Sequence, residues 1–308
     1  MISIRDLRVD YDNLCAVNDL TLEVDAGEVC GLIGPNGAGK TTTMRTMLGL
    51  IEPTYGSIVL DGVDVREFPR EVNAIVGFMP DFPPIYEDLL VWEFVDLFAA
   101  SYRIPRRERK TRVDQYLELV GLIEKRNEGI PGLSRGMRQR LMLAKTLIPD
   151  PRILLLDEPA SGVDPQGRID LKNIIKQLAG EGKTILVSSH ILSEMNEFCT
   201  SVAIMERGRL VVGGRIDEVN ARIMGATLLV VEVLGDPASF LQAVAADPHA
   251  GEPVLKDGAY ELRYAGKAEE ASDLLARLVG AGVRVAAFSR RRENLEELFL
   301  KVGAKELA

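Results

Sequence analysis

The residues best suited to binding phosphate groups lie in one glycine-rich stretch near the start of the 308-residue chain. This stretch is Gly34-Pro35-Asn36-Gly37-Ala38-Gly39-Lys40-Thr41, which fits the pattern G-x-x-x-x-G-K-[ST]. It follows an expected strand and opens an expected helix, so a chance glycine-rich turn is the weaker interpretation. Glycines let backbone N–H groups surround phosphate oxygens, and a helix N-terminus adds positive potential. We expect Lys40 to reach the β- and γ-phosphates of a nucleotide, Thr41 to ligate Mg²⁺ and Thr42 to complete the loop.

A second candidate lies where the apolar run Ile153–Leu156 meets two acidic residues, Asp157 and Glu158. A carboxylate that ends a buried strand typically holds the Mg²⁺ opposite such a phosphate loop. We therefore expect Asp157 to be a metal ligand and Glu158 to orient and deprotonate an attacking water. The alternative is a core strand followed by an exposed acidic turn. The phosphate loop favours the catalytic interpretation.

A third segment is Leu133-Ser134-Arg135-Gly136-Met137, followed by an apolar helical run. Ser134 is a good N-cap for that helix. By itself the pattern also fits a capped surface helix rich in arginine.

With these three segments in this order, residues 1–220 resemble the ATP-binding subunits of ATP-binding-cassette (ABC) transporters. That family carries Leu-Ser-Gly-Gly-Gln between its two nucleotide motifs; here Arg135 and Met137 replace a glycine and the glutamine, while Ser134 and Gly136 remain. The resemblance implies ATP and Mg²⁺ as cofactors. It also implies a homodimer in the ATP-bound state, in which ATP on Lys40 of one copy faces Ser134 and Gly136 of the other.

The resemblance assigns roles to further positions. Tyr11 matches the aromatic that stacks on adenine, although a tyrosine packed on the core is the alternative. Ser161-Gly162-Val163-Asp164 matches the loop at the dimer interface. His190 matches the histidine that holds the γ-phosphate and the attacking water, which makes Glu158 and His190 the expected catalytic pair.

One position departs from the family. The loop after the expected strand Ala74–Met79 usually carries glutamine, whereas this chain has Asp81. A carboxylate there can still ligate Mg²⁺ or a water, but it is shorter and charged. The departure bears on how nucleotide binding is coupled to a partner.

The surrounding elements predict an α/β fold of the P-loop cassette type, with a parallel-sheet core, an antiparallel β subdomain and a helical subdomain. Residues 1–27 alternate as short antiparallel strands, and buried strands are expected at Val29–Ile33, Ile153–Leu156 and Thr184–Val187. Residues 86–150 predict several helices, and Val202–Met205 with Arg209–Val212 predict a hairpin. The ATP-binding domain is expected at 1–222.

The order strand, helix, two strands, helix, strand after residue 225 predicts a small ferredoxin-like α/β domain at 225–308. A last helix is expected at Asn294–Leu300. That segment resembles the tail of ATPase subunits of bacterial drug, sodium and polysaccharide exporters, which implies an accessory domain and a separate permease.

Composition narrows the function further. Net charge is −9, which argues against a nucleic-acid partner, and three separated cysteines with two histidines exclude a Cys/His metal site. No apolar run is long enough for a membrane span and no signal peptide is evident. We expect a cytoplasmic protein, peripheral on the cell membrane. Residues Asp81–Tyr86 and the helices that follow would meet the permease, with Trp92 and Phe94 either docking or in the core.

Two alternatives to an export motor stay open at this point. One is a soluble cassette ATPase that acts on ribosomes or DNA, against which the acidic charge and the single cassette argue. The other is a regulatory, non-catalytic cassette, which Asp81 and the altered Leu133–Met137 segment suggest and the intact Lys40, Glu158 and His190 oppose.

Overall fold

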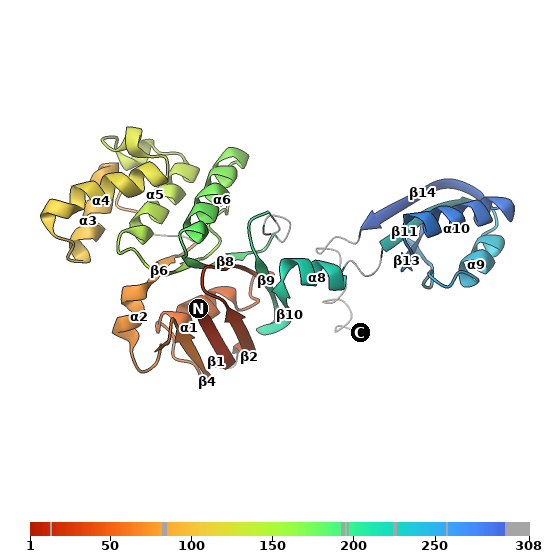
Figure 1. Cartoon of the computed structure of the whole chain (residues 1–308), viewed down its shortest axis with the longest axis horizontal. Helices are drawn as coiled ribbons and strands as arrows, with labels where there is room; N and C mark the ends of the chain where they lie inside the picture. The colour runs from red at the N-terminus through yellow and green to blue at the C-terminus, as the bar shows by residue number, and fades with distance from the viewer. Residues whose placement is uncertain are drawn as a thin grey trace. The chain divides into compact units, whose positions relative to one another are not determined.

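The computed structural model describes residues 1–12, 14–81, 85–191, 195, 197–223, 227–256 and 258–292 (Figure 1). The chain divides into two compact units, Met1–Ile216 and Asp217–Ala308. None of the described helices has the length and apolar character that crossing a bilayer requires. The helix expected at Asn294–Leu300 lies outside the described residues.

A six-stranded sheet forms the centre of the first unit, in the order β10-β9-β3-β8-β7-β6. Neighbours from β9 to β6 pair in parallel, and β10 closes the sheet as the antiparallel partner of β9. Every residue of β3, β7 and β8 is buried, as expected for apolar strands covered on both faces. The strands are β3 (Val29–Ile33), β6 (Val76–Met79), β7 (Ile153–Leu156), β8 (Thr184–Ser189), β9 (Ser201–Glu206) and β10 (Arg209–Arg215).

A four-stranded antiparallel sheet, ordered β2-β1-β4-β5, makes the second layer of this unit. Its strands are β1 (Ile2–Tyr11), β2 (Leu14–Val24), β4 (Tyr55–Leu60) and β5 (Val63–Asp64). The alternating pattern of residues 1–27 thus forms two long strands in place of several short ones. Their buried side chains, Ile4 and Leu22 among them, share one apolar core with the central sheet and with Met44 of the first helix.

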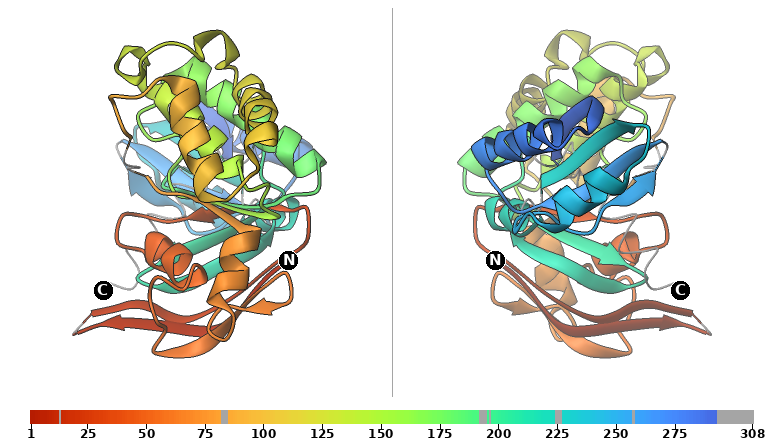
Figure 2. Two further views of the ribbon diagram at one scale, coloured as in Figure 1. Left: turned by 90° about the vertical axis from the view of Figure 1, so that its left-hand side faces the viewer. Right: turned by 90° about the vertical axis from the view of Figure 1, so that its right-hand side faces the viewer.

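The helices lie around the central sheet (Figures 1 and 2). Those of the helical region are on the side of the sheet away from β1, β2 and β4, which confirms the helices expected within 86–150. The helices of this unit are α1 (Lys40–Met47), α2 (Pro69–Ile75), α3 (Val91–Ser101), α4 (Arg106–Leu119), α5 (Arg135–Leu147) and α6 (Pro165–Gly180), with short 3₁₀ turns η1 (Ile123–Lys125) and η2 (Ile130–Gly132).

Two aromatic residues of α3 have different surroundings. Phe94 is fully buried and packs edge-on against Phe98, so it belongs to the core and the docking interpretation is wrong for it. Trp92 is half-buried, and the Arg126 guanidinium lies 5.9 Å from the centroid of its ring. Trp92 therefore lies where α3 contacts the residues that follow η1.

The strand expected at Ala74–Met79 is shorter than predicted. Ala74 and Ile75 end helix α2, and β6 begins only at Val76. Pro69 at the first turn starts this helix, because its fixed φ suits a position whose N–H has no helical partner. No glycine or proline separates helix from strand, so the apolar run gave no signal of the boundary.

The second unit has the predicted order and forms a four-stranded antiparallel sheet, β12-β13-β11-β14. Leu229 and Leu262 of the sheet share a core with Phe240 and Leu274 of the helices, which cover one face. Its elements are α8 (Ile216–Ile223), which begins at the last residue of the first unit, β11 (Thr227–Leu234), α9 (Ala238–Ala245), β12 (Val254–Lys256), β13 (Ala259–Tyr264), α10 (Ala268–Gly280) and β14 (Arg284–Arg292).

Candidate functional site

The glycine-rich loop follows β3 and ends where α1 begins at Lys40. Gly39 precedes the helix with a φ of 102°, and a Cβ built there would lie 2.5 Å from the carbonyl oxygen of Ala16. Only glycine fits such a conformation and such a close backbone approach. The loop is therefore fixed against β2, with the first N–H groups of α1 free to face an anion.

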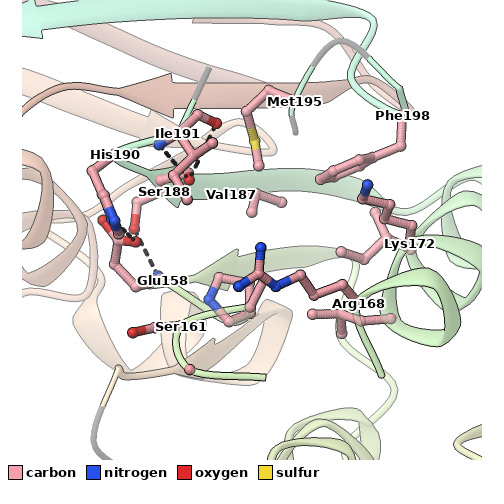
Figure 3. A pocket seen from close by; sticks show the side chains of 16 residues that line it. Glu158, Ser161, Arg168, Lys172, Val187, Ser188, His190, Ile191, Met195 and Phe198 are labelled. Atoms are coloured by element: carbon pink, nitrogen blue, oxygen red, sulfur yellow. Dashed lines mark hydrogen bonds and ion pairs between the residues drawn. The ribbon is translucent and has the colours of Figure 1, made fainter. Parts of the chain in front are cut away.

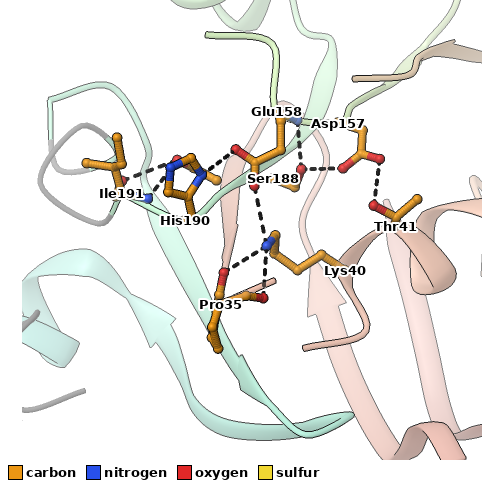
Figure 4. Close-up of polar contacts among 10 residues, drawn as sticks. Pro35, Lys40, Thr41, Asp157, Glu158, Ser188, His190 and Ile191 are labelled. Atoms are coloured by element: carbon orange, nitrogen blue, oxygen red, sulfur yellow. Dashed lines mark hydrogen bonds and ion pairs between the residues drawn. The ribbon is translucent and has the colours of Figure 1, made fainter. Parts of the chain in front are cut away.

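Lys40 is almost entirely buried beneath this loop. Its Nζ donates hydrogen bonds to the carbonyl oxygens of Gly34 at 2.7 Å and Pro35 at 3.3 Å, and it pairs with Glu158 Oε1 at 3.3 Å (Figure 4). A buried ammonium needs such partners, because removing it from water is costly. The lysine and the glutamate predicted from separate segments thus meet directly.

A chain of hydrogen bonds joins α1, β7 and β8 at the carboxyl edge of the central sheet (Figure 4). The Thr41 hydroxyl donates to Asp157 Oδ2 at 2.8 Å, and the Ser188 hydroxyl donates to Asp157 Oδ1 at 2.6 Å. The backbone N–H of Glu158 donates in turn to Ser188 Oγ at 2.8 Å. Asp157 is 2% exposed, so these bonds fix the orientation of both its carboxylate oxygens.

Glu158 and His190 lie side by side at the ends of β7 and β8. His190 Nδ1 is 2.9 Å from Glu158 Oε2. Glu158 has a φ of 47°, a left-handed conformation that is strained for a residue with a side chain. Strained backbone of this kind costs about 1–3 kcal/mol and concentrates at functional sites. Here it directs the carboxylate between Lys40 and His190.

Glu158 and the glycine-rich loop border a pocket of about 420 Å³. The phosphate loop from Asn36 to Thr42 forms its floor. Its other lining residues are Tyr11, Leu14, Cys15, Ala16, Asp81, Glu158 and Arg207. Tyr11 is 42% exposed in this pocket, so its ring is not part of the core.

Asp81 brings a further negative charge to the pocket. Burial, and then the nearby carboxylates of Asp157 and Glu158, raise the pKa of Asp81 above its ordinary value, while Arg135 and His190 act in the opposite direction. Its Oδ1 atom is buried and has no hydrogen-bond partner in the part of the chain that the structure describes.

Replacing Asp81 with asparagine is expected to stabilise the nucleotide-free chain at neutral pH. A raised pKa means that ionisation of Asp81 destabilises the folded state, and this penalty is present at neutral pH and disappears below the unfolded pKa of about 4. Because Asp81 is partly exposed, the gain should stay below about 1 kcal/mol. Denaturant unfolding of Asp81→Asn and of the exposed control Asp88→Asn at pH 7 and pH 3.5 measures it. A gain at pH 3.5 but not at pH 7 would contradict this assignment.

Ser134 and Gly136 are not among the residues that line the Lys40 pocket. Ser134 caps α5, its Oγ accepting a hydrogen bond from the N–H of Met137 at 3.3 Å, and it is exposed. Gly136 is buried against the loop before α6, where a Cβ would lie 3.2 Å from Val163. The neighbouring Arg135 packs its guanidinium directly on Gly162 of that same loop.

Glu158 and His190 also line a second pocket (Figure 3). It has a volume of about 160 Å³. Arg168 and Lys172 of α6 line one wall, and Met195 and Phe198 line the opposite one. Lys172 pairs with Glu197 at 2.7 Å, and Arg168 Nε donates to the carbonyl of Val163 at 2.9 Å. Glu158 therefore lines both pockets.

Comparisons with known proteins agree with this geometry. The family model for ABC transporters matches residues 17–161. Nod factor export ATP-binding protein I of Cupriavidus pinatubonensis is 36% identical over 100% of this chain and 92% of its own length. A solved structure described as an ATP-binding subunit of an ABC transporter has a TM-score of 0.65 and 30% identity, over 72% of this chain and 92% of its own. The chain belongs to the ABC transporter family.

It is an ATP-binding subunit of that family and has the ATPase function of the family. The dimeric ATP-binding cassette MJ0796, solved in a post-hydrolysis state bound to ADP and Pi, has the same fold, with a TM-score of 0.63 over 70% of this chain and 99% of its own at 23% identity. The cassette fold expected from the sequence is thereby confirmed.

Ser188 and Arg207 were not among the site residues expected from the sequence. Ser188 bridges Asp157 and the backbone of Glu158, and Arg207 lines the Lys40 pocket from the β9–β10 turn. Ser188 follows a buried strand beside His190, which was a usable signal. For Arg207 the sequence indicated only a position in a hairpin turn.

Replacing Tyr11 with alanine is expected to weaken ADP binding about fivefold, because one partly exposed stacking contact with the base is lost. Calorimetric titration of the purified variant measures this. Tyr102→Ala, which removes a similarly exposed tyrosine from the helical region, serves as the control. Unchanged affinity in Tyr11→Ala would show that Tyr11 is a structural residue only.

Proposed function

We propose that this chain is the ATP-hydrolysing motor of an exporter whose membrane-spanning permease is a separate polypeptide. The observation that carries the proposal is the 36% identity along the whole chain to a protein named as an export ATP-binding protein. That similarity extends through residues 217–308, beyond the segment that the family model matches. The motor would lie on the cytoplasmic face of the cell membrane, held there by the permease.

In this proposal residues 1–222 are the ATP-binding domain and residues 225–308 are an accessory domain. The helical subdomain, about 86–150, contacts the permease together with the segment Asp81–Tyr86. Trp92 and Tyr86, which are half-buried and exposed respectively, are available for that contact. No nucleic acid takes part.

The chain's own residues supply positioning and proton transfer. Lys40 holds the β- and γ-phosphates, and Tyr11 holds the base. Glu158 orients the attacking water and accepts its proton, and His190 fixes the Glu158 carboxylate through their 2.9 Å contact while it faces the γ-phosphate. Preorganised charges of this kind contribute strongly in a site that excludes water.

Mg²⁺ fits the donor set at the edge of the central sheet. The Thr41 hydroxyl and the Asp157 carboxylate are joined there. Asp81, whose buried Oδ1 has no hydrogen-bond partner among the described residues, lines the same pocket. Among the described residues, no three His, Cys, Asp or Glu side chains form a metal cluster alone. This agrees with an ion that takes one or two carboxylates and completes its shell with phosphate oxygens. When bound, Mg²⁺ would neutralise charge on the phosphates.

A homodimer is the proposed working form, because Ser134 and Gly136 do not line the chain's own Lys40 pocket. The N-terminus of α5, capped by Ser134, would instead offer its N–H groups to ATP held by a second copy. ATP would then close the dimer and hydrolysis would reopen it, which transmits force to the permease. The MJ0796 cassette, which shares this fold, is dimeric in its solved structure.

Affinity purification of tagged Glu158→Gln chain from gently solubilised native membranes with ATP tests the proposal. We expect a polytopic membrane protein in stoichiometric amount, identified by mass spectrometry. The same purification with Lys40→Ala, which cannot hold ATP, controls for ATP-driven assembly. Recovery of the chain alone, or with ribosomal or DNA-bound proteins, would overturn the exporter assignment in favour of a soluble ATPase.

A further inference from the structure

Arg207 lies in the two-residue turn between β9 and β10, far along the chain from the phosphate loop, and it lines the Lys40 pocket. Its side chain is exposed. Within the part of the chain that the structure describes, no carboxylate forms an ion pair with it. An exposed cation at the rim of a nucleotide pocket can therefore point at the ligand without first breaking a contact.

The turn itself is fixed to the phosphate loop. The N–H of Gly208 donates to the carbonyl of Ala38 at 3.1 Å, and the carbonyl of Gly208 accepts from the N–H of Asn18 at 2.8 Å. A Cβ at Gly208 would lie 2.8 Å from the carbonyl oxygen of Ala16, so only glycine allows this approach. The backbone beside Arg207 thus has a set position relative to both the phosphate loop and β2.

The local conformation also fixes the direction in which Arg207 leaves the turn. Both turn residues have positive φ, 47° at Arg207 and 81° at Gly208. Two such residues form the tight hairpin turn that matches the twist of the flanking strands. A left-handed conformation is uncommon for arginine, and here a short hairpin and two backbone hydrogen bonds impose it.

The charges that line the Lys40 pocket favour a cation at this turn. Among the residues that the structure describes, the charged ones that line the pocket are Lys40, Arg207, Asp81 and Glu158. Lys40 already pairs with Glu158. Without Arg207 the lining would be net negative, which would repel a nucleotide polyphosphate. Arg207 is the second cation of the pocket, and its fork of donors suits phosphate oxygens.

We propose that Arg207 is a nucleotide-binding residue that contacts the ribose and α-phosphate part of the nucleotide. Its turn lies against Ala16 of β2, two residues from Leu14, which pairs with Tyr11 at the end of β1. Among the described residues, no hydrogen bond or ion pair joins Arg207 to Glu158 or His190, the pair that we assign to the γ-phosphate. The inference rests on the proposed ATP site. It predicts a contact that ADP and ATP share.

Calorimetric titration with Mg-ADP, and with Mg-ATP in the Glu158→Gln background, tests this. Arg207→Asn removes the cation but keeps a residue that tolerates positive φ. We expect it to weaken ADP and ATP binding by the same factor of about ten, the value of one charge-assisted hydrogen bond. In the otherwise wild-type chain KM should rise with kcat unchanged, because the contact is made equally before and during reaction. Arg207→Lys should recover part of the affinity.

Arg215→Ala, at the far end of the same hairpin, removes the same charge away from the pocket and should bind like the parent chain. Equal affinity of Arg207→Asn and Arg215→Ala would overturn the inference while leaving the ATP site intact. Weaker ATP binding with unchanged ADP binding would place Arg207 on the γ-phosphate and also overturn it. Failure of the wild-type chain to bind either nucleotide would overturn the proposed function itself.

Discussion

Lys40→Ala is expected to lower ATP affinity by at least about 100-fold, since two charge-assisted contacts with phosphate are each worth about 1.5–3 kcal/mol. Lys40 is 6% exposed, and its Nζ lies among carbonyl and carboxylate oxygens beneath the loop that we propose binds the phosphates. No other lysine in the described part of the chain lines the pocket. Calorimetric titration with ATP and Mg²⁺ measures the loss.

Lys176→Ala, on the exposed face of α6, is the matched control and should bind as the wild type does. Because Lys40→Ala also leaves Glu158 without its ion-pair partner, a thermal melt must accompany the titration. A folded Lys40→Ala chain with unchanged ATP affinity would contradict the assignment of this loop as the ATP site.

Glu158→Gln is expected to reduce steady-state phosphate release by about 10²- to 10⁴-fold, the usual contribution of a general base. Glutamine has the same size and can keep the left-handed backbone and the bond from the backbone N–H to Ser188. It cannot take a proton from water. ATP affinity should therefore persist while turnover stops.

Glu124→Gln, an exposed carboxylate of η1, is the control for loss of one charge. Phosphate release and ATP titration on the same preparations separate binding from chemistry. Turnover that survives in Glu158→Gln would exclude Glu158 as the base. A wild-type chain that binds ATP but never hydrolyses it, alone or with the proposed permease, would favour a regulatory cassette.

The sequence was most informative where one short segment contains both a strand and the functional residues at its end. Ile153–Leu156 is apolar throughout and is followed by Asp157 and Glu158, so the buried strand and the site at its end could be predicted together. The phosphate loop was predictable for the same reason. The contact of Lys40 with Glu158 was not itself predicted; it arises because parallel strands end at a shared edge.

The features that could not be predicted from the sequence depend on contacts between distant segments. Nothing local distinguishes Arg207 from any other turn arginine, since its place in the pocket comes from the packing of Gly208 on Ala16. Phe94 and Trp92 both lie on α3, and only the packing of the helical region decides that Phe94 is buried. The start of β6 at Val76 likewise depends on pairing with Ile153 of β7.

Two of the three departures from the family pattern, Asp81 and Arg135, interact in the structure. Asp81 adds a negative charge to the pocket, and Arg135 counters it electrostatically while packing on Gly162. In the sequence they lie in separate segments. The fold brings both to the border between the pocket and the loop before α6.

Trp92 offers a way to follow conformational changes of this ATPase in solution. It is the only tryptophan of the chain, and its indole lies in the helical region beside Arg126, on a different element from every residue that lines the Lys40 pocket. Its intrinsic fluorescence is therefore a native optical probe of the helical region. A change in its emission on adding ATP would report a rearrangement passed on from the nucleotide, without any dye or label.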